Sequence, residues 1–221
     1  MYKKLFKRLI DFILAIVLLI ITSPILLIAV ILLRFENKGK IIFKQKRIGK
    51  GEKEFYIYKL RTMAIDKEDG INKVTKLGKV LRTTSIDELP QLINILKGEM
   101  SFIGPRPWIE KYTRYFNKQD RRRSEVLPGL SGWAQVQGRN DMSIKEKLAA
   151  DTWYVDHVTF KTDFIIFVKT IAIVFKKTGS SITEKGIEDE INELKERYQK
   201  EIYQKEIYEN GNESMLKKKI S

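Results

Sequence analysis

The sequence contains no cysteine and only one histidine, His157, among its 221 residues. Without cysteine the chain can form no disulfide, no cysteine-ligated zinc or iron–sulfur site and no thiolate nucleophile. A single histidine also excludes zinc sites built on a histidine pair, and it leaves one candidate base for a serine–histidine triad. Chemistry in this protein must therefore rest on carboxylates, lysine and arginine, hydroxyl groups or a hard cation bound by oxygen.

The sequence also lacks the Walker loop and the G-x-G-x-x-G motif, so neither glycine-rich route to nucleotide binding is supported. Positive charge, by contrast, is in excess. There are 42 lysine and arginine residues against 28 aspartate and glutamate residues, for a net charge of +14. The basic excess lies in residues 1–181, whereas residues 182–221 are slightly acidic. A basic body attracts phosphorylated small molecules, anionic lipid or nucleic acid.

One apolar run, Phe12–Leu33, contains no charged side chain. As a straight helix it would measure about 33 Å, enough to cross a membrane. Two features complicate a simple span. Pro24 at its centre should bend or break the helix, and basic residues flank both ends, which favours the cytoplasmic side for each end. A kinked span and a re-entrant helix-break-helix hairpin both remain open; the Thr22 and Ser23 hydroxyls are candidates to pair the backbone groups freed at the bend.

The segments after this run predict a small, mostly helical body. Ile41–Phe43 and Phe55–Met63 have the composition of two strands of a β-hairpin. Helices are predicted over Tyr112–Ser124 and Ser143–Tyr154, and Gly132–Asn140 is predicted to be a short strand or loop.

Phe164–Phe175 is a second apolar segment, framed by lysines. At 12 residues it would cover about 18 Å as a helix, which is too short to span a bilayer. It is either a helix that lies in the membrane interface or a buried core helix. Residues 182–221 alternate in charge and predict a helical tail, for which a solvated helix is the simpler interpretation and self-association or partner binding the alternative.

Asp87 and Glu88 stand directly before an apolar helical pattern that Gly98 should end. Asp87 could simply be the N-cap of that helix, a role that stabilises by about 1 kcal/mol and needs no function. The alternative is chemical. A carboxylate pair among arginines could hold Mg²⁺ and a diphosphate together, or a carboxylate could attack phosphorus as a nucleophile.

Five basic residues could form the phosphate site around that pair: Lys59, Arg61, Arg82, Arg106 and Arg139. The period of two along the predicted second strand places Lys59 and Arg61 on one face. Arg106 lies between two prolines, and Arg139 lies between a glycine and an asparagine. Arginines presented on such restricted backbone suit bidentate binding of phosphate.

Taken together, SIDELPQLINILKGEMSFIGPRP at 85–107, KLRTM at 59–63 and PGLSGWAQVQGRN at 128–140 resemble the bacterial sugar transferases, the monotopic polyprenyl-phosphate hexose-1-phosphate transferases. The resemblance covers about residues 1–180 and includes the central Ser23-Pro24 of the apolar run. It favours the re-entrant hairpin over the span. Relatives usually end in a short segment after the interfacial helix, so the charged tail departs from the family pattern.

The resemblance implies a concrete reaction. Family members move a sugar 1-phosphate from a UDP-sugar to undecaprenyl phosphate, with Mg²⁺, at the cytoplasmic face of the bacterial inner membrane. Their catalytic acidic pair corresponds to Asp87 and Glu88. The nucleophile corresponds to Asp87, which also corresponds to the metal ligand; it attacks the β-phosphorus, expels UMP and carries the phosphosugar until the lipid phosphate takes it. Glu88 could be a metal ligand or a base.

We therefore expect a mainly helical α+β monotopic membrane protein with a re-entrant helix-break-helix, a small β-hairpin and interfacial amphipathic helices. Its parts should be residues 1–36, a catalytic domain over 37–181 with an interfacial helix near 162–177, and a charged helical tail over 182–221. The expected partners are the UDP-sugar, the polyprenyl phosphate and membrane lipids, not nucleic acid. Two rival hypotheses are direct transfer in a ternary complex and a non-enzymatic basic scaffold tethered to the membrane. No residue indicates which sugar is used.

Overall fold

The computed structural model describes residues 2–37, 41–65, 72–138, 142–176, 192, 194–200 and 202–204. Within these residues helices predominate, and the strands form three two-stranded sheets. The α-helices are α1 (Lys7–Asn37), α2 (Lys76–Thr83), α3 (Leu92–Lys97), α4 (Glu110–Thr113), α5 (Lys118–Arg121), α6 (Trp133–Gln137), α7 (Ile144–Asp156) and α8 (Phe160–Lys176). The strands are β1 (Ile42–Ile48), β2 (Glu54–Leu60), β3 (Met63–Ile65), β4 (Asn72–Val74), β5 (Ser101–Ile103) and β6 (Gly129–Ser131). The mainly helical α+β class predicted from the sequence is confirmed.

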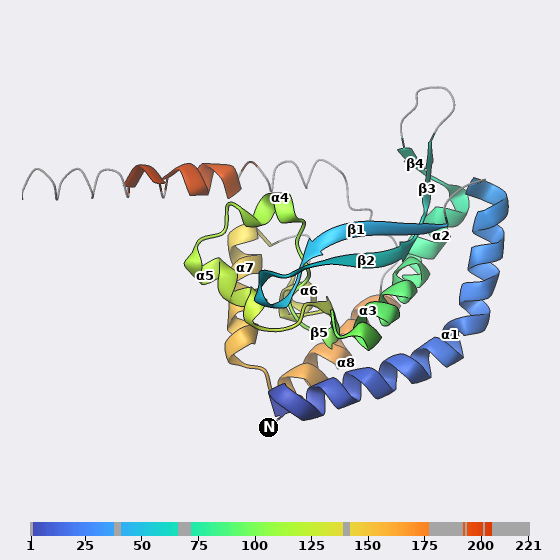
Figure 1. Ribbon diagram of the computed structural model, residues 1–221, viewed down its shortest axis with the longest axis horizontal. Coiled ribbons are helices and arrows are strands. Elements are labelled where there is room, and N and C mark those ends of the chain that lie inside the picture. The colour runs from blue at the N-terminus through green and yellow to red at the C-terminus, as the bar shows by residue number, and fades with distance from the viewer. Residues whose placement is uncertain are drawn as a thin grey trace, which may run out of the picture.

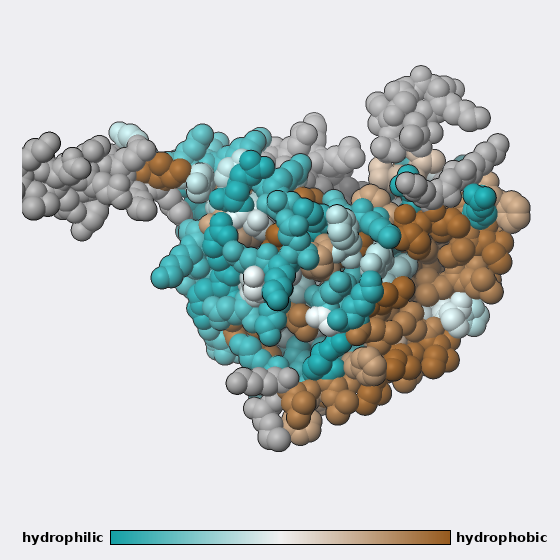
Figure 2. Space-filling model, viewed as in Figure 1, coloured by the Kyte–Doolittle hydropathy of each residue, from teal (hydrophilic) through white to brown (hydrophobic). Residues whose placement is uncertain are grey.

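The predicted apolar run forms the long helix α1, which follows a π-helical turn at Tyr2–Phe6. Among the described residues it is the one helix long and apolar enough to cross a membrane. Most of its large apolar side chains are exposed. In Figure 1 α1 wraps around one edge of the body, and Figure 2 shows a hydrophobic band along that edge. An apolar surface of this extent favours lipid over water.

α1 is bent, with Pro24 in its interior (Figure 1). Proline has no N–H to donate to the Ile20 carbonyl, and the Ser23 hydroxyl donates to that carbonyl instead (2.8 Å). The Thr22 hydroxyl donates to the Leu18 carbonyl (2.7 Å). The first bond confirms the predicted role for Ser23, whereas the Thr22 hydroxyl bonds to a carbonyl that Pro24 does not leave without a donor. The predicted break was wrong in one respect: the chain stays helical through the bend, where the Ser23 hydroxyl pairs the carbonyl that proline leaves without a donor.

Both halves of α1 pack on the same body. Ala15, before the bend, is fully buried in a cluster with side chains of β2 and α3. Leu33, after the bend, is fully buried in a second cluster with side chains of β2 and α2. A re-entrant segment needs this geometry, since its two ends must return to one side of the bilayer.

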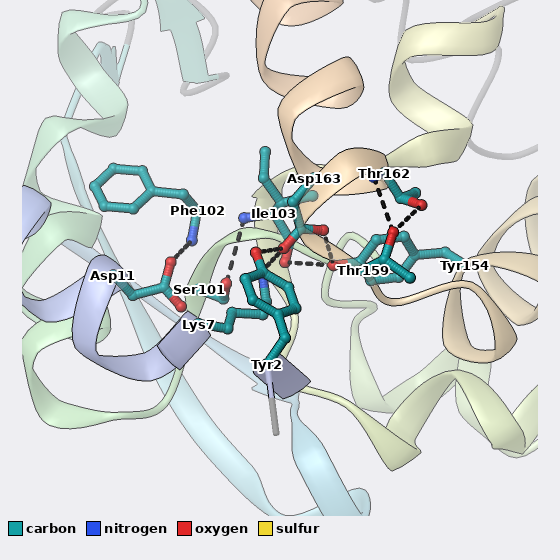
Figure 3. Close-up of polar contacts among 10 residues, drawn as sticks. All are labelled: Tyr2, Lys7, Asp11, Ser101, Phe102, Ile103, Tyr154, Thr159, Thr162 and Asp163. Atoms are coloured by element: carbon teal, nitrogen blue, oxygen red, sulfur yellow. Dashed lines mark hydrogen bonds and ion pairs between the residues drawn. The ribbon is translucent and has the colours of Figure 1, made fainter. Parts of the chain in front are cut away.

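A polar cluster fastens the N-terminal end of α1 to α7 and α8 (Figure 3). Asp163 of α8 accepts hydrogen bonds from the Tyr2 hydroxyl (2.7 Å), the Lys7 ammonium (2.6 Å) and the Tyr154 hydroxyl (2.7 Å). The Lys7 and Asp163 side chains are only 12% and 8% exposed. Asp11, one turn further along α1, accepts from a backbone N–H of β5 (3.1 Å). The entry of α1 is therefore fixed by a buried ion pair.

The predicted hairpin is present with different bounds. β1 and β2 pair antiparallel from Ile42 opposite Leu60 to Ile48 opposite Glu54. The first strand is thus longer than predicted. The second ends at Leu60, and the next residues form β3, which pairs with β4. The turn comprises a short 3-10 helix at Lys50–Glu52. The inner face of β2 packs on the segment that carries Asp87 and on α3.

Two predictions for the second half of the body were wrong. Tyr112–Ser124 is not one helix: α4 ends at Thr113, and Asn117 starts a new helix with a reciprocal cap from Asp120. Within Gly132–Asn140 the structure has the short helix α6, and residues 139 and 140 lie outside the described residues. α7 begins at the predicted place, where Ser143 caps it.

α8 is exposed along most of its apolar face, with Phe164 at 56% and Phe167 at 49%, whereas Ile166 is fully buried. A helix buried in a core would not leave these side chains accessible, so the interfacial alternative fits better. Of the tail, the described residues are helical. Leu194 is buried in a cluster with side chains of α4 and α7, and Arg197 pairs with Asp120. This part of the tail packs on its own body.

Candidate active site

The acidic pair lies on a 3-10 helix, Ile86–Gln91, that leads into α3. Ser85 precedes it in the left-handed region (φ 58°, ψ 17°), an uncommon conformation for a residue other than glycine. Asp87 is the second residue of the 3-10 helix and not its N-cap, so the predicted N-cap position of Asp87 was wrong. Gly98 ends α3 with φ 81°, as predicted. The bent entry at Ser85 turns the acidic pair toward β2.

Asp87 is 8% exposed, a degree of burial that carboxylates rarely reach. Burial, and next the negative charge of Glu88, raise the pKa of Asp87 to about 6. The positive charges of Lys59 and Arg82 act in the opposite direction. At neutral pH the group is therefore mostly ionised but poorly solvated, the state that suits a carboxylate nucleophile.

Glu88 is held by the cations that the sequence singled out. Its Oε1 lies 2.6 Å from Lys59 Nζ and 3.7 Å from Arg106 Nη2. Burial, partly offset by Glu88, lowers the pKa of Lys59. Lys59 comes from β2 and Arg106 from the loop between the two prolines, so residues 59, 88 and 106 meet from three separate segments. The structure thus brings together five of the predicted residues: the pair Asp87 and Glu88, with Lys59, Arg82 and Arg106 around it.

Arg82 and Arg61 are placed less centrally than Lys59 and Arg106. Arg82 is exposed, and its Nε donates to the Thr62 hydroxyl (2.7 Å). Arg61 is half-buried just past the end of β2, where its backbone N–H donates to the Ile41 carbonyl (2.7 Å). Arg139 lies outside the described residues.

Sequence reasoning missed Arg47, which lies on β1 near the site. Its Nη1 donates to the Pro107 carbonyl (3.2 Å), on the loop that carries Arg106. Burial, and next the charge of Arg106, lower the pKa of Arg47 to about 10, so it stays protonated at neutral pH. The alternation of β1 could have revealed it had the first strand been extended past Phe43, because Arg47 stands opposite the buried Phe55.

The residues present fit a magnesium ion of a particular kind. Within the described part of the chain, no three acidic or histidine side chains gather into a cage for a metal. Mg²⁺ at phosphate-transfer sites usually takes only one or two carboxylates and completes its shell with water and phosphate oxygens. Asp87 and Glu88 match that donor set, which requires a phosphate ligand alongside.

Known proteins resemble this chain over most of its length. Residues 2–177 match the family model described as bacterial sugar transferase. The chain is 41% identical over 179 residues to the uncharacterized sugar transferase EpsL of Bacillus subtilis, a match that covers 78% of this chain and 89% of that protein.

Two relatives carry names that state a reaction. UDP-N-acetylgalactosamine-undecaprenyl-phosphate N-acetylgalactosaminephosphotransferase of Aeromonas hydrophila is 36% identical over 188 residues, 79% of this chain but only 44% of that protein. UDP-glucose:undecaprenyl-phosphate glucose-1-phosphate transferase of Caulobacter vibrioides is 35% identical over 181 residues, 75% of this chain and 68% of that protein. With the family model matching most of its length, this chain belongs to the bacterial sugar transferase family.

Proposed function

We propose that this protein transfers a sugar 1-phosphate from a UDP-sugar to undecaprenyl phosphate and releases UMP. The observation that carries the proposal is Asp87, a largely buried carboxylate set among Lys59, Arg82 and Arg106 on a body fastened to an exposed apolar helix. The names of the Aeromonas and Caulobacter relatives support the reaction class. They differ in the sugar, so the identity of the hexose does not carry over.

The proposed chemistry has two displacements at one phosphorus atom. In the first, a carboxylate oxygen of Asp87 bonds to the β-phosphorus of the donor, the bond from that phosphorus to the bridging oxygen breaks, and UMP leaves. In the second, a phosphate oxygen of the lipid bonds to the same phosphorus and the bond to Asp87 breaks. The product is a lipid diphosphate sugar. Storage on Asp87 lets a soluble donor and a bilayer-bound acceptor occupy the site at different times.

Phosphoryl transfer depends mainly on positioning and on neutralising charge. Arg106 and Arg82 are exposed enough to reach a donor diphosphate, and Arg61 and Arg139 are further candidates. Lys59 holds Glu88 and so fixes the second carboxylate beside the first. Glu88 is then available either to bind metal or to accept a proton from the acceptor phosphate. Mg²⁺, held by Asp87 with phosphate oxygens of the donor, would supply further positive charge at the transferred group.

The exposed apolar faces of α1 and α8 support attachment to a membrane. We place the protein at the cytoplasmic membrane, with α1 re-entrant and the site on the cytoplasmic face, where UDP-sugars are made. Basic residues at both ends of α1 support this orientation. In that arrangement the acidic pair lies at the level of the lipid headgroups, within reach of an acceptor whose phosphate cannot leave the bilayer surface.

The test is a UMP-release assay with the full chain in detergent, a panel of UDP-sugars and Mg²⁺, without lipid acceptor. One equivalent of UMP for each protein molecule supports the covalent route, and Asp87→Asn should abolish it. Glu110→Gln, which alters an exposed carboxylate on α4, is the matched control and should keep the burst. UMP that appears only after undecaprenyl phosphate is added would favour direct transfer in a ternary complex.

A further inference from the structure

Arg123 is the most deeply buried arginine in the described part of the chain, at 6% exposure, although it belongs to a run of three arginines that reads as a solvated surface. Its neighbours Arg121 and Arg122 do face solvent and pair with Glu52 and Asp156. Taking a guanidinium out of water costs several kcal/mol in effective terms, so its burial needs a reason.

Three hydrogen bonds fix the Arg123 guanidinium. Its Nε and Nη2 donate to Asp151 Oδ2 of α7 (3.0 and 2.6 Å), and Nη2 also donates to the backbone carbonyl of Arg106 (2.6 Å). Asp151 is only 3% exposed. Aromatic rings complete the enclosure: the guanidinium carbon lies 5.5 Å from the Trp108 ring centroid and 5.8 Å from that of Phe116.

The carbonyl that Arg123 holds belongs to the arginine whose side chain approaches Glu88. One residue further along the chain, Arg47 donates to the Pro107 carbonyl (3.2 Å). The backbone of Arg106 is thus restricted by its two prolines and held through successive carbonyls by two guanidinium groups. Its own side chain stays 46% exposed, with Nη2 3.7 Å from Glu88 Oε1. Arg106 and Arg123 also line one shallow pocket.

We infer that Arg123, oriented by Asp151, is a positioning residue that aims the Arg106 side chain at the donor phosphates; this rests on the function proposed above. A buried ion pair is weak support for stability, because apolar residues of similar volume often do as well. What this ion pair does provide is a fixed orientation of the Arg123 guanidinium, and through it of the Arg106 backbone. A lysine would keep the charge but cannot donate from a planar fork to Asp151 and to the Arg106 carbonyl together.

The test measures KM for a UDP-sugar that the wild-type chain uses, in detergent with Mg²⁺, for Arg123→Lys in the wild-type and the Arg106→Ala backgrounds. KM does not depend on how many molecules are folded, so a merely structural defect lowers the maximal rate and leaves KM unchanged. A displacement of about 1 Å can cost about 100-fold. We expect Arg123→Lys to raise KM about tenfold in the wild-type background and less than about twofold when Arg106 is absent.

A difference of at least about fivefold amounts to a coupling of at least about 1 kcal/mol between the two sites. Arg122→Lys is the matched control, since it makes the same change one residue earlier, on a side chain that binds Asp156 at the surface, and its KM should stay within about twofold. An unchanged KM, or an equal rise in both backgrounds, overturns the inference. If Arg123→Lys shows no cooperative melting transition, Asp151→Asn takes its place: its KM is measured in the wild-type and Arg106→Ala backgrounds, and the same results support or overturn the inference. UMP release by the wild-type chain tests the proposed function separately.

Discussion

Replacing Asp163 with asparagine removes the charge that anchors the entry of α1. Asp163 accepts hydrogen bonds from Tyr2, Lys7 and Tyr154 at 2.6–2.7 Å, and the Lys7–Asp163 pair is about nine-tenths buried. Breaking a buried pair by removing one partner costs about 3–5 kcal/mol. Asparagine keeps the shape and can still accept from Tyr154, but it leaves the Lys7 ammonium unpaired. We therefore expect a loss of about 3 kcal/mol in the free energy of unfolding.

The assay is urea unfolding of the full chain in detergent, followed by tryptophan fluorescence; Trp133 and Trp153 stack on each other beside α8 and report on this region. Asp156→Asn is the matched control, because it makes the same change in an exposed pair with Arg122. Its unfolding midpoint should equal that of the wild-type protein within error. Equal midpoints for Asp163→Asn and Asp156→Asn would refute the assignment of Asp163 as the anchor of α1.

Three further predictions follow. Only the ionised Asp87 is a nucleophile, and its pKa is raised to about 6, so the rate of the UMP burst should fall about tenfold for each pH unit below 6. Glu88→Gln removes a negative charge that raises the pKa of Asp87, so it should move this fall in rate to lower pH. An unchanged pH profile would contradict the assignment of the pH dependence to Asp87. Gly78→Ala should destabilise by about 1–3 kcal/mol in urea unfolding, since its Cβ would lie 2.1 Å from the Thr62 carbonyl oxygen; Val80→Ala, at an exposed position of the same helix, should not. Single cysteines at Leu5 and Phe35, both exposed, should react with an impermeant maleimide from the same side of closed vesicles; labelling from opposite sides would exclude the re-entrant arrangement.

The elements that the sequence predicted well are those with local signals. A charge-free run with a central proline was enough to predict α1 and its bend, and of the two candidate hydroxyls beside Pro24 that of Ser23 is the compensating donor. Gly98 marked the end of α3, and Ser143 marked the start of α7. Each of these depends on residues within a few positions of one another, where backbone chemistry decides the outcome.

Errors arose where a local cap inside a predicted helix was overlooked, or where packing and an unusual backbone conformation override local propensity. Apolar and polar periodicity over Tyr112–Ser124 predicts one helix, yet Asn117 and Asp120 cap a new start inside it. Asp87 has the composition of an N-cap, but packing against β2 and the left-handed Ser85 move the start of the turn upstream.

The sequence predicted the residue types and most of the residues of the candidate site. It did not predict which arginines lie beside the acidic pair and which ones hold the loop that carries Arg106. Arg123 and Asp151 are 28 positions apart, and Arg47 and Pro107 are 60 positions apart. Nothing in a single sequence distinguishes the buried third arginine of a basic run from its two exposed neighbours. Such pairings depend on the tertiary arrangement of β1, α7 and the proline-bounded loop.

The most direct test of the central claim is the intact mass of the protein after a brief incubation with a competent UDP-sugar and Mg²⁺, quenched before any lipid acceptor is added. The account predicts an added mass equal to one sugar phosphate, which peptide analysis should locate on Asp87, and no added mass for Asp87→Asn. Wild-type protein that turns over with undecaprenyl phosphate yet never gains this mass would contradict the role assigned to Asp87.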